Sequence, residues 1–120
     1  MSSEIQEQLN LIVQSIIRET QPERIILFGS YANGKPRKDS DFDLFIVKNT
    51  TLRSVDRDQE IRKVLPFNRK KGVDLIVLTS QEVDQAFREK NIFIHKIFKE
   101  GKELYAKNKR IYGLVQKSSR

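Results

Sequence analysis

The chain has 120 residues, 38% of them hydrophobic and 32% charged, which is the composition of one globular domain with a core of its own. The absence of cysteine excludes a disulfide framework and any thiolate metal site. The formal net charge is +7, but residues 101–120 hold six Lys or Arg against one acid, so the basicity belongs mainly to the end of the chain. The N-terminus is polar and no apolar run approaches the ~20 residues of a membrane span, so we expect a cytoplasmic protein.

The first half of the chain predicts one helix and two strands. Apolar residues recur at helical spacing from Ile5 to Ile17, which indicates a helix that ends before Pro22. Residues 25–28 form a short apolar run, and residues 41–47 form a second one, so both are expected to be buried strands.

The second half repeats this alternation. A helix is expected to start at 49–51 and to carry an apolar stripe that includes Val55, and residues 73–78 predict a third strand. Thr79 and Glu82 have the spacing of a capping box, which predicts one long helix running to a stop at Gly101. Its expected inner face consists of Val83, Ala86, Phe87, Ile94, Ile97 and Phe98.

The predicted elements define an α/β (α+β) fold, a small mixed sheet flanked by helices. Residues 104–106 are expected to add a short edge strand. We therefore expect one domain over residues 1–106, followed by a basic, weakly ordered tail at 107–120.

The stretch between the first two strands carries the chemistry. The first apolar run ends in Gly29-Ser30, ten residues follow, and Asp41 and Asp43 then stand in the second run. Residues two apart in a strand face the same side, so these carboxylates would project together. Two adjacent carboxylates repel each other, and a hard divalent cation such as Mg²⁺ relieves the repulsion. Glycine lets a backbone approach a ligand closely, and the N–H groups of a turn attract phosphate. The pattern predicts a metal and polyphosphate site.

Asp74 stands at the start of the third strand, as Asp41 does at the start of the second. A third carboxylate beside the pair gives the ligand set of a two-metal phosphoryl-transfer site. One ion would be held by all three acids and the other by Asp41 and Asp43. No nucleophilic side chain is required for such a reaction.

The combined pattern resembles the DNA polymerase beta superfamily of nucleotidyltransferases. The features that carry the resemblance are Gly29-Ser30, ten intervening residues, Asp41 and Asp43, and then Asp74, all beside apolar strands. More narrowly, the chain is similar to the minimal nucleotidyltransferases (MNT), the antitoxin halves of bacterial and archaeal HEPN/MNT modules. The similarity covers roughly residues 22–105, and the single-domain length fits this minimal branch.

The resemblance implies a polymerase beta-like fold, two Mg²⁺ ions, ATP as the donor, and nucleotide transfer with release of pyrophosphate. For the antitoxin branch it further implies AMPylation of a tyrosine on a HEPN toxin, a ribonuclease that is thereby silenced. A hetero-oligomer with that toxin is then expected. By position, Gly29 and Ser30 would hold the triphosphate, Asp41 and Asp43 both metals, and Asp74 the catalytic metal and the attacking hydroxyl.

The chain departs from this family at one position. Many relatives have an arginine where this chain has Asn33, and Lys35 or Arg37 could replace its charge, although such residues are more often part of a solvated loop. We expect Tyr31 to pack against the fold or the nucleotide pocket, and His95 to be structural or exposed.

Two other functions are compatible with the sequence. One is a binding module that neutralises a toxin sterically, docking on it or on nucleic acid through the basic tail. The other is nucleotidyl transfer to a small molecule, which is disfavoured because nothing after Tyr105 could supply the additional helical region of such enzymes.

Overall fold

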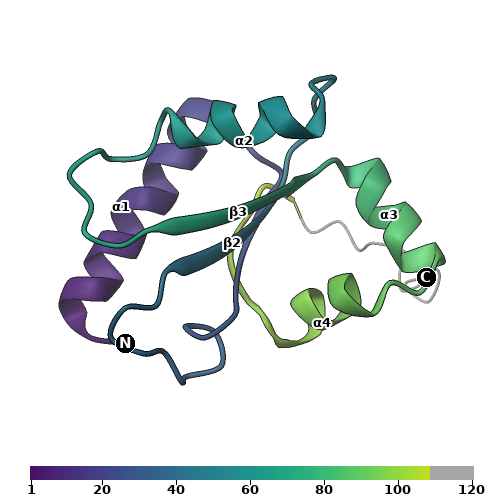
Figure 1. Ribbon diagram of the computed structural model, residues 1–120. Coiled ribbons are helices and arrows are strands. Elements are labelled where there is room, and N and C mark those ends of the chain that lie inside the picture. The colour runs from purple at the N-terminus through teal and green to yellow at the C-terminus, as the bar shows by residue number, and fades with distance from the viewer. Residues whose placement is uncertain (109–120) are drawn as a thin grey trace.

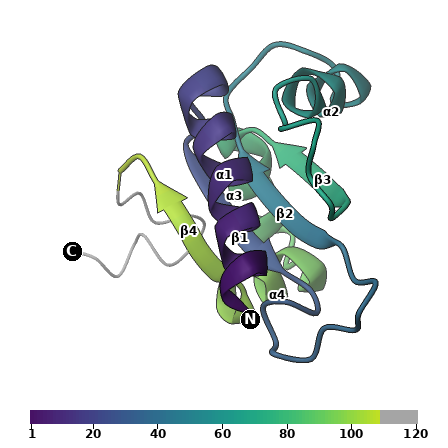
Figure 2. The same ribbon diagram turned by 90° about the vertical axis from the view of Figure 1, so that its left-hand side faces the viewer.

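The computed structural model describes residues 1–108 as a four-stranded sheet with helices on both faces (Figures 1 and 2). Along the chain, the elements are α1 (Ser3–Thr20), β1 (Arg24–Phe28), β2 (Phe42–Val47), α2 (Ser54–Arg62), β3 (Val73–Leu78), α3 (Ser80–Arg88), α4 (Ile92–Glu100) and β4 (Lys102–Ala106). This mixed sheet flanked by helices confirms the predicted fold class. No helix among residues 1–108 has the length and apolar character needed to cross a membrane.

The strands lie in the order β3-β2-β1-β4, so β3 and β4 form the two edges. β1 and β2 are antiparallel and joined by a long loop, whereas β2 and β3 are parallel and joined through α2. β4 returns antiparallel to β1. All four predicted strands are therefore present, with Asp41 lying just before β2 instead of inside it.

The face of the sheet under α1 and α2 buries the larger core. Strand side chains alternate between the two faces, so every second residue of β1 and β2 contributes to it. Its buried members include Leu9, Ile12, Ile16, Ile25, Leu27, Phe42, Leu44, Ile46 and Ile61. As predicted, Phe42, Leu44 and Ile46 face the side opposite to that of Asp43, since Phe45 and Val47 lie in the other core.

The opposite face is covered by α3 and α4. The residues buried there are Ile26, Phe45 and Val47 from the sheet and Val83, Ala86, Phe87, Ile94 and Ile97 from the helices. Phe98 is partly buried beside them, and its ring meets those of Phe45 and Phe87 edge-on at centroid distances of 5.6 and 5.1 Å. The predicted inner face is confirmed.

The prediction of one long helix from 80 to 100 is wrong, because a turn between α3 and α4 interrupts it. Lys90 adopts a left-handed conformation with φ of 58°, which ends the first helix. The Asn91 side chain then accepts a hydrogen bond from the Ile94 N–H at 3.0 Å and starts the second. The capping box at the start of α3 is confirmed, because the Thr79 hydroxyl accepts from the Glu82 N–H and the Glu82 carboxylate accepts from the Thr79 N–H.

The second helix also starts later than predicted. Residues 49–51 do not begin it; α2 starts at Ser54. The Asn49 side chain instead accepts a hydrogen bond from the Ser80 N–H at 2.9 Å, so its amide oxygen serves the start of α3.

The apolar stripe predicted for α2 is wrong at Val55, which is 66% exposed. Arg57 is buried in its place. Its guanidinium donates to both Glu82 carboxylate oxygens, at 2.7 and 3.2 Å, and to the Leu52 carbonyl at 2.9 Å. A charged side chain is buried here because its donors are satisfied, which joins α2 to α3.

The predicted stop at Gly101 is confirmed. The Gly101 N–H donates to the Ile97 carbonyl at 2.8 Å, and β4 follows directly. After β4, the Lys107 N–H donates to the Glu23 carbonyl at 2.8 Å. Most of the predicted basic tail, residues 109–120, lies outside the described residues.

Candidate active site

A single helical turn follows β1 and presents the predicted phosphate-binding residues. Gly29 has φ of +75°, a conformation that glycine adopts without strain. Its carbonyl accepts hydrogen bonds from the Ala32 and Asn33 N–H groups at 3.0 and 3.1 Å, and the Ser30 carbonyl accepts from the Lys35 N–H at 3.1 Å. The N–H groups at the start of such a turn, those of Ser30 and Tyr31, have no partner within the turn and can serve an anion.

The three predicted aspartates lie at neighbouring positions across the sheet. Asp43 is the register partner of Phe28 on β1 and of Asp74 on β3. Partners in a parallel pair project to the same face, so Asp43 and Asp74 lie side by side on the face that α3 and α4 cover further along. Asp41 precedes Asp43 by two residues and lies next to Gly72, whose carbonyl accepts from the Phe42 N–H at 3.0 Å.

Two glycines make room for these carboxylates. A Cβ atom on Gly29 would lie 2.1 Å from Oδ2 of Asp43. A Cβ atom on Gly72 would lie 2.8 Å from Cγ and Oδ1 of Asp41. Both distances are far below van der Waals contact, so the backbone at each site comes as close to an acid as the absence of a side chain permits.

The electrostatics of the site centre on Asp43. Burial raises the pKa of this carboxyl group above its usual range, and the neighbouring charge of Asp74, a hydrogen bond with Asp74 and the charge of Asp41 raise it further. Each of these causes disfavours the ionised form. A bound divalent cation would reverse this balance, because it attracts all three carboxylates.

The arrangement fits Mg²⁺ in part. Its ligands would be carboxylate oxygens, which this hard cation prefers. Asp43 and Asp74 are in direct contact, but no three acidic or histidine side chains within residues 1–108 form a ready-made metal site. Asp41 lies near enough for its charge to act on Asp43.

The two predicted cations Lys35 and Arg37 lie in an exposed loop. The Lys35 N–H donates to the Asn33 side chain at 3.0 Å, and the Arg37 N–H donates to the Ser40 hydroxyl at 2.7 Å. Neither residue lines the hollow beside Gly29. The loop is tied to the segment before β3, since the Lys71 ammonium donates to the Lys38 carbonyl at 2.7 Å.

The hollow beside Gly29, here called the α4 hollow, has a volume of about 320 Å³ and lies between the turn after β1 and α4. Its walls include Phe28, Gly29, Asn33, Phe93, Lys96 and Glu100. Sequence reasoning missed Lys96. The spacing of Phe93, Lys96 and Glu100 does place them on one side of a helix. The sequence does not reveal, however, that this side meets the turn after β1.

The aromatic and histidine predictions are confirmed. Tyr31 is only 4% exposed and belongs to the core, where its ring lies 5.0 Å from that of Phe42. His95 is exposed on α4 and packs edge-on against Phe87 at 4.6 Å. Neither residue contributes to the aspartate site.

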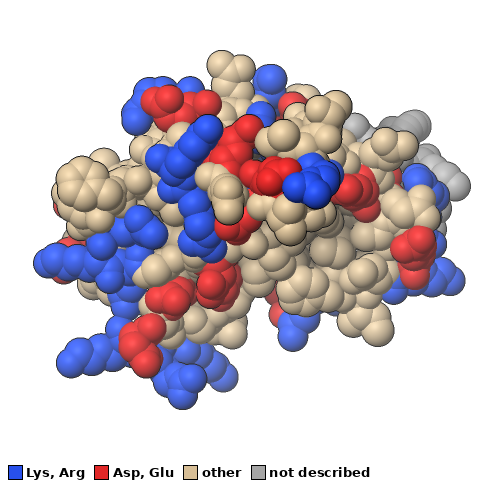
Figure 3. Space-filling model, turned by 45° about the horizontal axis from the view of Figure 1, so that its top comes forward, with Lys and Arg blue, Asp and Glu red and all other residues tan. Residues whose placement is uncertain are grey.

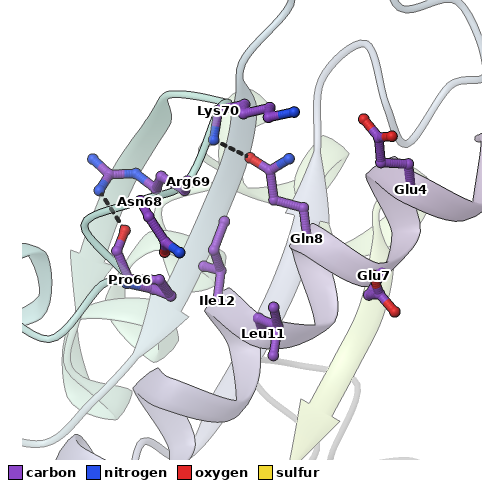
Figure 4. Close-up of a pocket in the computed structure, with 9 residues that line it drawn as sticks. All are labelled: Glu4, Glu7, Gln8, Leu11, Ile12, Pro66, Asn68, Arg69 and Lys70. Atoms are coloured by element: carbon purple, nitrogen blue, oxygen red, sulfur yellow. Dashed lines mark hydrogen bonds between the residues drawn. The ribbon is translucent and has the colours of Figure 1, made fainter.

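A second hollow, of about 170 Å³, lies on the α1 side of the sheet (Figure 4). Gln8 spans it, and its side-chain oxygen accepts from the Lys70 and Lys71 N–H groups at 2.8 and 2.6 Å. Figure 3 shows Lys and Arg side chains concentrated at the left-hand end of the visible face, where Figure 1 places the loops before β2 and β3. The loops before β2 and β3 include Lys35, Arg37, Lys38, Arg69, Lys70 and Lys71.

Comparisons with known proteins agree with this geometry. A Sulfolobus solfataricus protein assigned as a nucleotidyltransferase has 22% sequence identity and a TM-score of 0.57, with 89% of this chain and 90% of that chain covered. A chain of a toxin–antitoxin complex with AMP-PNP has 22% identity and a TM-score of 0.51, covering 81% and 73%. A mutant of the toxin–antitoxin MntA-HpeT has 24% identity and a TM-score of 0.50, covering 83% and 73%. No curated protein matches the sequence significantly.

A mixed sheet of this order, with a Gly-Ser turn beside neighbouring aspartates, is a nucleotidyltransferase fold, and the similar structures share it. The family model of the polymerase beta nucleotidyltransferases matches residues 10–110. The chain belongs to this family.

Proposed function

We propose that the protein is a Mg²⁺-dependent enzyme that transfers AMP from ATP to a tyrosine of a HEPN-type toxin and thereby acts as its antitoxin. The observation that carries the proposal is the contact of Gly29 with Asp43, with Asp74 beside it on the neighbouring strand. A phosphate-binding turn thus lies directly against crowded carboxylates. That combination suits a metal-bound triphosphate.

Each residue has a distinct role in this proposal. Gly29 and Ser30 bind the triphosphate through backbone N–H groups, and Asp41 and Asp43 bind both metal ions. Asp74 binds one ion and accepts the proton of the attacking hydroxyl. When bound, Mg²⁺ lowers the pKa of the attacking group and neutralises charge on the leaving group.

The transfer itself is a single displacement at the α-phosphorus. The tyrosine oxygen forms a bond to that phosphorus, and the bond between the phosphorus and the oxygen bridging to the β-phosphate breaks. Pyrophosphate leaves with the electron pair, and Asp74 takes the hydroxyl proton. The products are AMP-tyrosine and pyrophosphate.

The choice of a protein acceptor is supported by two features. Residues 1–108 include no additional helical region that could bind a small acceptor, which favours an acceptor on a partner. Two of the similar structures are toxin–antitoxin complexes, one of them with AMP-PNP. A hetero-oligomer in the cytoplasm is the corresponding assembly.

A second candidate function is a steric antitoxin, which neutralises the toxin by binding alone. It is favoured because the three acids do not form a ready-made metal site within residues 1–108. The two candidates are separated by α-labelled ATP and the co-purified partner, using the wild type and Asp74→Asn. For the enzyme, Asp74→Asn should bind Mg·ATP within a few fold of wild type. It should also lose more label transfer than the ~10²–10⁴-fold attributed to general-base catalysis alone. If neither protein labels the partner and both neutralise it, steric binding replaces catalysis.

A further inference from the structure

We propose that Lys96 of α4 binds the terminal phosphates of the nucleotide and supplies the positive charge that the Gly29 turn lacks. The inference rests on the proposed function, since it assumes a triphosphate at Gly29. It adds a residue from a helix that is remote from the Gly29 turn in sequence.

The order of the strands gives the direction of the bound nucleotide. From one edge of the sheet to the other lie Asp74 on β3, Asp43 on β2, Gly29 after β1, and Gly101 before β4. The reacting phosphate belongs at the two aspartates, where the metal ligands are. A triphosphate that extends from there across Gly29 reaches the α4 hollow, which Gly29 and Gly101 both line.

The charge of the α4 hollow is set by α4. The turn contributes Gly29 and Asn33, both uncharged, although a triphosphate needs a counter-charge. Of the residues that line the hollow, all of them within 1–108, Lys96 is the one cation. Its ammonium group has no ion pair within the described part of the chain, so it is available to a phosphate.

The position of Lys96 is fixed by packing on either side of it. One turn earlier, the ring of Phe93 meets that of Phe28 edge-on with centroids 6.0 Å apart, which holds α4 against the end of β1. The next residue, Ile97, is buried in the core under α4. The helix therefore presents Lys96 to the hollow without a rearrangement, whereas Lys35 and Arg37 lie in an exposed loop that does not line it.

The test is calorimetry of Mg·ATP and of AMP with purified protein. Lys96→Gln should weaken Mg·ATP binding about tenfold, equivalent to about 1.4 kcal/mol, and AMP binding by less than about twofold, because AMP lacks the terminal phosphates. Lys96→Arg should retain binding, since it keeps the charge. Glu100→Gln should strengthen Mg·ATP binding, because it removes a negative charge from the same hollow.

Lys99→Gln is the matched control, since Lys99 is an exposed lysine of α4 that does not line the hollow. It should bind Mg·ATP as wild type does, and thermal unfolding without ligand should show all variants folded. Unchanged Mg·ATP binding in Lys96→Gln, or equal weakening of ATP and AMP, overturns the role of Lys96. A wild type that does not bind Mg·ATP overturns the proposed function as well, so the two failures are distinguishable.

Discussion

Replacing Gly29 by alanine tests the contact on which the candidate active site depends. The residue has φ of +75°, so any side chain there costs about 1–2 kcal/mol of stability. The new Cβ would also lie 2.1 Å from Oδ2 of Asp43. Cγ and Cβ of Asp43 would lie 3.0 and 3.3 Å away as well, so the carboxylate must rotate and the strand must shift slightly, which adds to the backbone cost. We expect Gly29→Ala to remain folded but to lose Mg·ATP affinity by more than the ~10–100-fold typical of changes in the outer shell of a metal site.

Gly34→Ala is the matched control, since Gly34 has φ of +79° but no described atom within 4 Å of the point where a Cβ would lie. Urea unfolding should show a loss of stability in both variants, because both incur the same backbone cost, and a somewhat larger loss in Gly29→Ala because of the contact with Asp43. Calorimetry should show lost Mg·ATP binding in Gly29→Ala alone. Equal binding by both variants would refute the reasoning that Gly29 is required for the position of Asp43.

Three further predictions concern stability. Because the pKa of Asp43 is raised in the folded state, its carboxyl group favours folding below pH 3.8 and this contribution is lost as the pH rises through the folded pKa. In EDTA, Asp43→Asn should therefore be more stable than wild type at pH 7, with the urea midpoint difference disappearing below pH 3.8; a constant difference would contradict the assignment. Arg57→Ala should cost about 1.5–3 kcal/mol, because the buried guanidinium loses its hydrogen bonds to the partly exposed Glu82 carboxylate and to the Leu52 carbonyl, and a urea midpoint shift equal to that of Arg62→Ala on the exposed side of α2 would refute it. Lys90→Gly should raise the free energy of unfolding by up to about 1 kcal/mol, because φ of 58° is strained for lysine. The urea midpoint should rise accordingly, and a lower midpoint would show that the turn is not strained.

The sequence predicted the strands and the neighbouring aspartates well because one local rule governs both. Apolar runs bounded by Gly or polar residues produced β1, β2 and β3 within a residue of their observed limits. Once these strands are placed, Asp43 and Asp74 each occupy an early strand position. Parallel pairing then brings them together, as observed.

The parts that the sequence did not predict depend on contacts between distant segments. Asn49 is a residue type typical of helix starts, but its side chain accepts a hydrogen bond from the Ser80 N–H. Lys90 carries no strong breaking signal, and the turn there is adopted because α3 and α4 both pack on the sheet. Lys96 reaches the α4 hollow for the same reason, since only the packing of α4 shows which side of the helix meets the turn after β1.

The continuous parallel register of β2 and β3 determines which changes in length the chain can accept. The pairs run without interruption from Phe42 with Val73 to Val47 with Leu78. Residues inserted into the exposed part of segment 63–72 leave these pairs intact, so the connection can lengthen or shorten among relatives. A single residue inserted into β2 before Asp43, or into β3 before Asp74, would instead turn the side chains that follow it to the other face of the sheet. Homologues should therefore vary in the length of this connection while the spacing within each strand stays constant.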